Sequence, residues 1–216
     1  MRMISTAAIV GVAALMLAAT GCKNPAEGKA KAAVSEARPT PSGPLQGATE
    51  RAVLSPANTK LEWKGSKVTG SHTGGFAKFS GSIEGTGADP TKALLTIDID
   101  LTSLTSDTPK LTGHLKSKDF FNVAEHPKGR FVSTSIKTGG QKGASHTITG
   151  NLTLRGVTKS IAFPATLQIT DTDVHAASEF WIDRTLWGIS FPGMKDNLIR
   201  KEVVIKLDVK VKRQKQ

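Results

Sequence analysis

The stretch Leu95-Thr96-Ile97-Asp98-Ile99-Asp100-Leu101 alternates apolar and polar side chains without a break. Successive side chains of a β-strand point to opposite faces of its sheet, so this period of two predicts a strand with one buried face and one face in water. Four more segments repeat the alternation, at residues 148–154, 161–169, 174–182 and 203–211. The chain is therefore expected to consist mainly of half-buried antiparallel strands.

Shorter apolar segments add to this set of strands. They lie at residues 61–64, 76–83 and 131–136, separated by turns rich in Gly, Pro, Asn and Asp, and they bring the count to about eight. Only residues 110–119 predict a helix, and it is short. Eight antiparallel strands form a closed or nearly closed barrel, whose interior at about this size can hold a small ligand. We predict an all-β fold, an antiparallel barrel of about eight strands with one short helix.

A basic segment that carries a histidine, within residues 111–127, runs directly into paired aromatic residues. His114, Lys116 and Lys118 place N–H donors and positive charge beside Phe120 and Phe121. This chemistry suits a molecule with one anionic end and one apolar end. A plainer interpretation stays open, in which His114 is a structural histidine and the two phenylalanines are core residues first and pocket lining second.

Several motifs of the chain resemble motifs of the YceI-like family of lipid-binding, lipocalin-like barrels, and they occur in the same order. Residues 114–123 are similar to its H-L-x-S-x-D-F-F-x-V signature, and residues 149–159 are similar to its T-G-x-L-T-x-x-G-V-T-K hairpin. Residues 61–76, 97–104 and 182–189 resemble its first strand pair, its central strand and its I-x-R-x-x-aromatic-G-I segment. The resemblance covers roughly residues 54–212. Asn122, often Asp in the family, and the basic residues 128–130 depart from the pattern and leave the head-group preference open.

The resemblance implies a lipocalin-like barrel with a long hydrophobic cavity that takes a polyisoprenoid or a similar amphiphile. We expect its tail to contact Leu95, Ile97, Ile99, Leu101, Phe120, Phe121, Phe131, Leu152, Leu154, Phe163, Phe180 and Ile182. The polar head is expected to contact His114, Lys116 and Arg184. Arg184 has a structural alternative, because its planar guanidinium also suits bidentate bonds to a carboxylate or to carbonyls.

Small residues among the apolar positions have two interpretations. Gly150, Ala165, Ala176 and Ser178 either leave room for a guest chain or fit the taper of a barrel filled by its own side chains. A filled barrel would favour an envelope scaffold or interaction module. A third and weaker alternative is an enzyme that acts on a lipid-linked substrate.

The start of the chain has the order of a bacterial lipoprotein signal. Arg2 precedes an apolar run from Ile4 to Ala19, and small residues then lead to Cys22. The run is shorter than the about 20 residues that a spanning helix needs. We expect a signal peptide over residues 1–21 and lipidation of Cys22. The alternative is ordinary secretion with a free thiol at Cys22, the sole cysteine, which acylation would remove from an oxidising compartment.

Three parts of the chain are predicted from this pattern. After the signal peptide, residues 22–52 have few large apolar side chains and are expected to form a flexible tether. Residues 53–213 are expected to form the barrel domain. Lys23 after the cysteine, in place of Asp, favours the outer membrane, so we expect a lipid-anchored protein of the bacterial cell envelope that faces the periplasm.

Other chemistries find little support in the sequence. The five histidines lack metal-ligand spacing, and the chain has neither a G-x-S-x-G elbow nor a phosphate-binding loop. We predict no metal, no cofactor and no catalytic activity. A net charge of +11 favours anionic surfaces, for which lipid head groups are better candidates than nucleic acid. The expected partners are an isoprenoid-type lipid and, through Cys22, a membrane; the oligomeric state is not predicted.

Overall fold

The computed structural model of the 216-residue chain describes residues 23–41, 43–195 and 197–215. The predicted signal peptide and Cys22 lie outside these ranges. In chain order the strands are β1 (Ala30–Lys31), β2 (Ala33–Glu36), β3 (Glu50–Leu54), β4 (Thr59–Lys67), β5 (Gly70–Phe76), β6 (Phe79–Gly85), β7 (Leu94–Asp100), β8 (Leu104–Ser106), β9 (Lys128–Thr138), β10 (His146–Leu154), β11 (Val157–Ile169), β12 (Asp173–Asp183), β13 (Gly193–Met194), β14 (Asn197–Lys212) and β15 (Gln214–Lys215).

The helical elements are short. They are the α-helix α1 (Pro109–Lys116) and the 3-10 helices η1 (Pro90–Lys92), η2 (Leu101–Ser103), η3 (Gln141–Gly143) and η4 (Arg184–Trp187). Within the described ranges, no helix has the length and apolar character needed to cross a bilayer.

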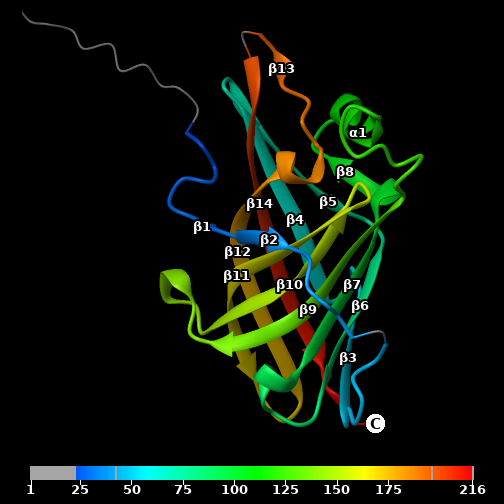
Figure 1. The fold of residues 1–216 in the computed structure, drawn as a ribbon, viewed down its shortest axis with the longest axis vertical. Helices are drawn as coiled ribbons and strands as arrows, with labels where there is room; N and C mark the ends of the chain where they lie inside the picture. Colours follow the sequence, from blue (N-terminus) through cyan, green and yellow to red (C-terminus); the bar gives the residue numbers. More distant parts are fainter. Residues whose placement is uncertain (1–22, 42, 196, 216) are drawn as a thin grey trace, which may run out of the picture.

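The strands form one sheet that curls into a barrel (Figure 1). Its path runs β15-β3-β6-β7-β9-β10-β11-β12-β14-β4-β5-β8, and every neighbouring pair on this path is antiparallel. The two end strands of the path are each linked along the chain to a strand inside the path. β15 directly follows β14, and β8 follows β7 through η2. The predicted class, an all-β antiparallel lipocalin-like fold with one helix, is confirmed.

The structure has more strands than the predicted eight, and β5 shows why. Its sequence, Gly-Ser-His-Thr-Gly-Gly-Phe, has three glycines and no apolar alternation, so the period-two pattern cannot detect it. Pairing with β4 and β8 holds it in the sheet. Gly74 is required there, because an added Cβ would lie 2.0 Å from the Thr105 carbonyl oxygen and 2.4 Å from the Trp63 ring.

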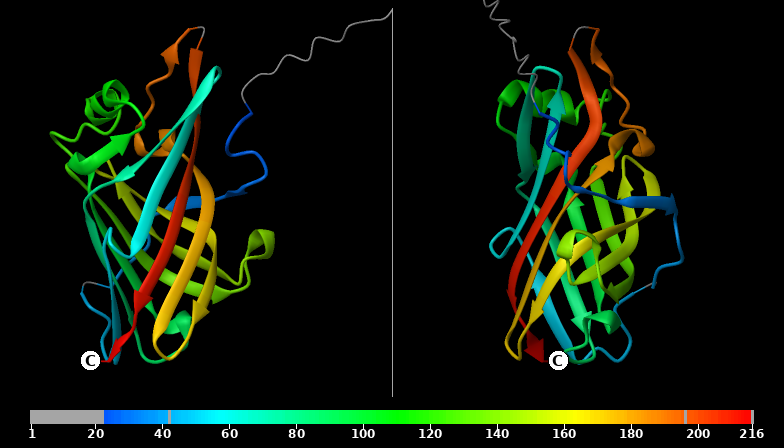
Figure 2. Two further views of the ribbon diagram at one scale, coloured as in Figure 1. Left: turned by 180° about the vertical axis from the view of Figure 1, so that it is seen from behind. Right: turned by 90° about the vertical axis from the view of Figure 1, so that its left-hand side faces the viewer.

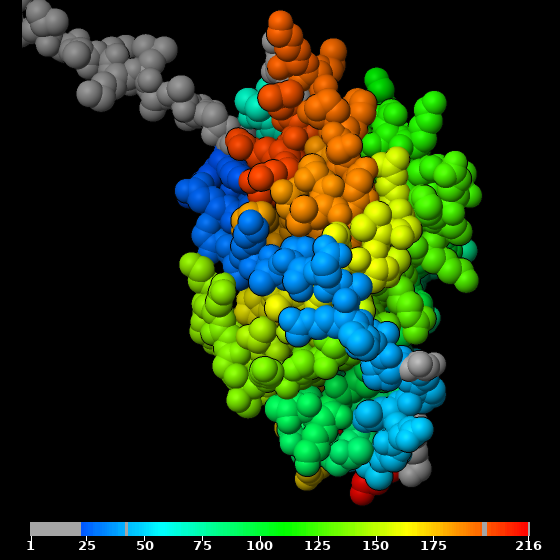
Figure 3. All heavy atoms as spheres, in the orientation of Figure 1, coloured from blue at the N-terminus to red at the C-terminus, as the bar shows by residue number. Residues whose placement is uncertain are grey.

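The segment predicted as a flexible tether, residues 22–52, contains ordered structure. Residues 29–38, which we call the N-terminal strap, lie across the outside of the barrel, and Figure 3 shows this part of the chain in blue. β1 pairs in parallel with β12, and β2 pairs antiparallel with β11. Backbone pairing needs no large apolar side chains, which is why composition alone did not reveal the strap. Two residues of the strap, Ala30 and Ala32, are buried, at 3% and 0% exposure.

The helix and its following loop lie at the upper end of the barrel in Figure 1, beside β8 (Figure 2). Pro109 occupies the first helical position, where its missing N–H costs nothing, so the helix begins one residue before the predicted start. It ends at Lys116, and the following turns are held by backbone bonds such as Asn122 N to Ser117 O, 2.8 Å. Asn122 has φ 47°, a left-handed conformation that Asn and Asp tolerate better than most residues.

Candidate binding cavity

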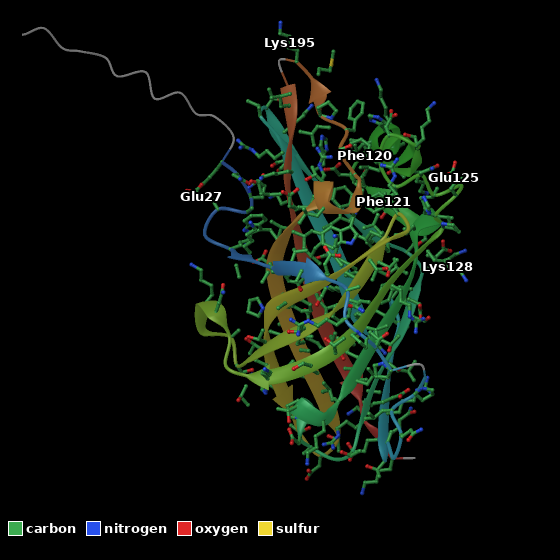
Figure 4. The ribbon with its side chains drawn as sticks, in the orientation of Figure 1. Glu27, Phe120, Phe121, Glu125, Lys128 and Lys195 are labelled. Atoms are coloured by element: carbon green, nitrogen blue, oxygen red, sulfur yellow. The ribbon has the colours of Figure 1, made fainter. Side chains whose placement is uncertain are left out.

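A cavity of about 520 Å³ occupies the barrel end that α1 and β13 adjoin. Aliphatic and aromatic side chains from the inner faces of the strands form most of its wall. All but one of the residues predicted to contact a lipid tail lie on this wall. They are Leu95, Ile97, Ile99, Phe120, Phe121, Phe131, Leu152, Leu154, Phe163, Phe180 and Ile182. Phe120 and Phe121 lie beneath α1, on the side toward the barrel (Figure 4).

Leu101 is the exception and lies away from the cavity. Strand β7 ends at Asp100, and Leu101 begins the 3-10 turn η2, so the alternation that aims Ile97 and Ile99 inward stops one residue earlier than the sequence suggests. Leu101 is fully buried, at 0% exposure, in the closely packed core. Its role is packing.

The opposite end of the barrel is filled. A second cavity there measures about 70 Å³, and its lining includes Ala165, Ala176 and Ser178. A side chain at Gly150 would meet the Phe131 ring, 2.5 Å from an added Cβ. These small residues therefore fit a packed taper and do not create the large cavity.

His114 lines the cavity from α1, but its ring is held by neighbours. Its Nε2 lies 3.1 Å from Asp119 Oδ2, a hydrogen bond between two partly exposed side chains. The ring packs edge-on against Phe120 and Phe191, with ring centroids 5.0 and 4.8 Å apart. Phe191, from the loop after η4, was not predicted as a site residue, because no periodic pattern surrounds it.

Lys116 does not line the cavity. It lies on the last turn of α1, where its charge acts on Asp100. The hydrogen bond from Thr102 is the main cause that lowers the pKa of Asp100, and Lys78 and Lys116 add to it. Lys116 is half-buried.

Arg184 lines the cavity and is buried, at 6% exposure. Its guanidinium donates to four backbone carbonyls, those of Ile189, Phe191 (2.8 Å), Ile199 (3.3 Å) and Arg200 (3.2 Å). It also lies 5.7 Å from the centroid of the Phe120 ring. Burial lowers the pKa of Arg184, and the charge of Asp183 partly opposes this shift, but an arginine side chain remains protonated in proteins. Arg184 thus has the structural role that the sequence left open, as a donor to backbone carbonyls. Its positive charge also lies at the cavity.

Further cations at the cavity were not predicted. Lys67, Lys110 and Arg200 line it together with Arg184 and the histidines His72 and His114, while no Asp or Glu of the described residues does so. Lys67 and Arg200 come from β4 and β14, and Lys110 comes from α1. No sequence pattern joins these three residues, because barrel closure brings them together.

The N-terminal strap lies behind the cavity wall. β11 and β12 pair directly only between residues 166–169 and 174–177. On the N-terminal side of Pro164, which has no N–H to donate to a neighbouring strand, β11 pairs with the strap at residues 159–162. β12 pairs with the strap at residues 180–181. Val34 pairs with Ile161 and Ala30 pairs with Phe180, and both of these barrel residues line the cavity. The strap therefore bridges β11 and β12 behind this part of the cavity wall.

Comparison with known proteins identifies the fold and the family. The model of the YceI-like domain matches residues 53–211. The chain belongs to the YceI-like family. The strap precedes the matched region and so is not part of the domain that defines the family.

Relatives of this YceI-like chain include the UPF0312 protein of Pseudomonas putida strain W619, 37% identical over 107 residues, which are 49% of this chain and 55% of the relative. The UPF0312 protein of Pseudomonas savastanoi pv. phaseolicola is 38% identical over 93 residues, 43% of this chain and 47% of the relative. The chain thus spans about half the length of these relatives.

Two solved structures share the YceI-like fold. Burkholderia cenocepacia BcnA aligns with a TM-score of 0.58 at 21% identity, covering 70% of this chain and 95% of BcnA. A polyisoprenoid binding domain from Saccharophagus degradans, implicated in plant cell wall breakdown, aligns with a TM-score of 0.59 at 15% identity, covering 77% and 99%. At these identities the likeness establishes the fold.

Proposed function

We propose that this YceI-like protein binds one amphiphilic lipid, of the polyisoprenoid type, in its cavity and does not transform it. The observation that carries the proposal is an apolar cavity of about 520 Å³ that the chain leaves unfilled at one end of an otherwise packed barrel. Ligand pockets typically measure about 300–1,000 Å³ and are lined mainly by apolar and aromatic side chains. The structural neighbour from Saccharophagus degradans, a polyisoprenoid binding domain, supports the ligand class.

Binding without turnover fits the polar groups at the cavity better than catalysis does. His72 Nδ1 lies 2.9 Å from Asp107 Oδ1, an arrangement that also occurs in catalytic triads. A triad further needs a nucleophile that hydrogen-bonds to the histidine. The cavity-lining Ser66 has a buried hydroxyl oxygen with no hydrogen-bond partner in the described part of the chain. His72 and Asp107 therefore serve to hold β5 and the segment after β8 together.

We propose that the protein works in the bacterial cell envelope, anchored through a lipidated Cys22 to the outer membrane and facing the periplasm. The support is the order of residues 1–22 and Lys23. The strap alters the expected reach of such an anchor. Ala30, the start of β1, stands eight residues after Cys22. An extended chain of that length spans at most about 29 Å, so the barrel would stay close to the lipid surface.

Organic extraction of the purified protein followed by mass spectrometry tests the proposal. We expect one class of long-chain isoprenoid lipid in amounts approaching one molecule per protein. A variant with a filled cavity, Leu152→Trp, should lose most of it, whereas Thr166→Trp, at an exposed position of β11, should keep it. A wild-type protein without extractable lipid that also fails to bind added farnesol would favour the filled-barrel alternative.

A further inference from the structure

The charged side chains that line the cavity all have the same sign. Lys67, Lys110, Arg184 and Arg200 are permanent cations at neutral pH, and the described wall contains no carboxylate. They come from four separate elements, β4, α1, η4 and β14. An apolar ligand has no need of such a wall, and an amphiphile with a cationic head would be repelled by it.

Three of these cations form no ion pair with a described residue. Outside the cavity, eight of the 24 described lysines and arginines form ion pairs, for example Arg130 with Asp98 at 2.6 Å and Lys29 with Glu179 at 2.7 Å. Lys67, Lys110 and Arg200 form none with a described residue. No ion pair within the described chain therefore neutralises the charge of these three side chains at the cavity, and this charge is available to an anionic group of a ligand.

Arg200 and Arg184 differ in what holds them. Four carbonyls occupy the guanidinium of Arg184, whereas Nε of Arg200 is buried and has no hydrogen-bond partner among the described residues. Arg200 lies where the β14–β4 pairing is irregular, between Ile199 and Val203. Such irregularities redirect side chains out of the regular alternation. Arg184 is thus fixed by the protein, and Arg200 keeps hydrogen-bonding capacity for another molecule.

The position of these cations gives the ligand a direction. The phenylalanines Phe131, Phe163 and Phe180 line the cavity in the body of the barrel. Lys67 ends β4 and Lys110 lies in the first turn of α1, and both elements reach the upper end of the barrel in Figures 1 and 2. Lys110 is exposed, and Lys67 and Arg200 are half-buried. An amphiphile would therefore lie with its tail inside the barrel and its head among the cations.

We propose that the bound lipid carries an anionic head, of the phosphate or carboxylate class, and that Lys67, Lys110 and Arg200 bind it. Arg184 adds a fixed positive charge behind them. This inference rests on the proposed lipid binding and names the chemistry of its polar end. The proposed residues differ from the head-group residues expected from the sequence. In the structure, His114 is hydrogen-bonded to Asp119, and Lys116 does not line the cavity.

Farnesyl phosphate and farnesol are suitable probes, because they share a tail and differ in the head. Their affinities for the purified full chain, freed of endogenous lipid, would be measured by titration calorimetry at low and high salt. Wild type should prefer the phosphate, and added salt should reduce that preference. Partly exposed ion pairs contribute modestly, so Lys67→Gln and Arg200→Gln should each lower the phosphate-to-alcohol ratio about two- to fivefold. Farnesol binding should change little.

Matched variants make the test specific. Lys118→Gln removes an exposed lysine near α1 that does not line the cavity, and the ratio should stay at the wild-type value. Arg200→Lys keeps the charge and should keep most of the preference. Equal affinity of wild type for the two probes, or an equal loss of preference in Lys118→Gln and Lys67→Gln, would overturn the anionic-head proposal alone. If neither probe binds, the proposed function itself fails, and the anionic-head inference fails with it.

Discussion

The backbone amide of Ala32 donates a hydrogen bond to the carbonyl of Trp181, 2.9 Å away, and so fastens the N-terminal strap to the wall of the barrel. Side-chain contacts hold the strap as well. Lys31 Nζ lies 5.1 Å from the centroid of the Trp181 ring, and the Asn151 amide both donates to the Arg38 carbonyl (2.6 Å) and accepts from the Arg38 N–H (3.0 Å). The side chains that the strap buries are small, so its attachment depends mainly on backbone bonds.

The first prediction concerns this strap. Ala32→Asp would bury a carboxylate at a fully covered position and should detach residues 29–38, because a buried charge without a partner is very costly. Hydrogen exchange of the strap amides should then rise strongly, and bound lipid should dissociate faster, because the strap pairs with Ile161 and Phe180 of the cavity wall. Ala33→Asp is the control, since Ala33 is the exposed neighbour in the chain. Equal protection of the strap in both variants would contradict the importance of the buried Ala32 for its attachment.

The second prediction separates packed core from cavity wall. Leu101→Ala removes side-chain atoms from a filled region and should lower the free energy of unfolding by about 2–5 kcal/mol. Ile97→Ala removes atoms beside space that is already empty, so lipid-free protein should lose about 1–2 kcal/mol, while lipid affinity falls. Urea denaturation of lipid-free protein gives the two values. Equal destabilisation, with unchanged lipid binding, would indicate that Ile97 lies in packed core.

The third prediction concerns Arg184. Arg184→Met keeps most of the volume but removes the donors to four carbonyls, and buried acceptors left unpaired cost about 1–3 kcal/mol each where water cannot replace the donor. We expect a total loss of about 2–4 kcal/mol in the free energy of unfolding, since water reaches some of the carbonyls. Arg130→Met removes an exposed ion pair and should cost about 1 kcal/mol or less. Similar losses for the two variants would argue against the structural role of Arg184.

The fourth prediction is a pH dependence at Asp183, which caps η4. Burial alone would raise the pKa of Asp183, but hydrogen bonds from Thr185 and Lys201 outweigh burial and hold the pKa below its usual value of 3.8. A lowered pKa in the folded state means that the carboxylate stabilises the fold fully above pH 3.8 and that this contribution is lost as pH falls through the folded-state pKa.

Asp183→Asn should therefore destabilise the protein at pH 7 and become equivalent to wild type in strong acid. Guanidinium denaturation at pH 7 and at successively lower pH would show the two curves converging. Asp171→Asn, at an exposed position, provides the control and should follow wild type throughout. A constant difference between Asp183→Asn and wild type at every pH would contradict the prediction.

The local elements of this protein follow from its sequence because strand and helix periods are properties of short segments. The alternation at residues 95–101 predicted β7, whose odd-numbered residues Leu95, Ile97 and Ile99 are buried. The helix predicted over residues 110–119 corresponds to α1, and motif order indicated the family. The inward-facing strand residues that line the cavity were identifiable for the same reason, since successive side chains of a strand point to opposite faces.

The sequence alone could not decide what depends on contacts between distant segments. The strap has no periodic signal of its own, because its pairing with β11 and β12 replaces the burial of large side chains. Lys67, Lys110 and Arg200 are far apart in the chain. They line one cavity only because the sheet closes and α1 lies against its end. Arg184 was ambiguous until its surroundings supplied four carbonyls. The sequence by itself determined the strands and their buried faces, since these are set within a few residues; only the tertiary structure decided which cations share the cavity.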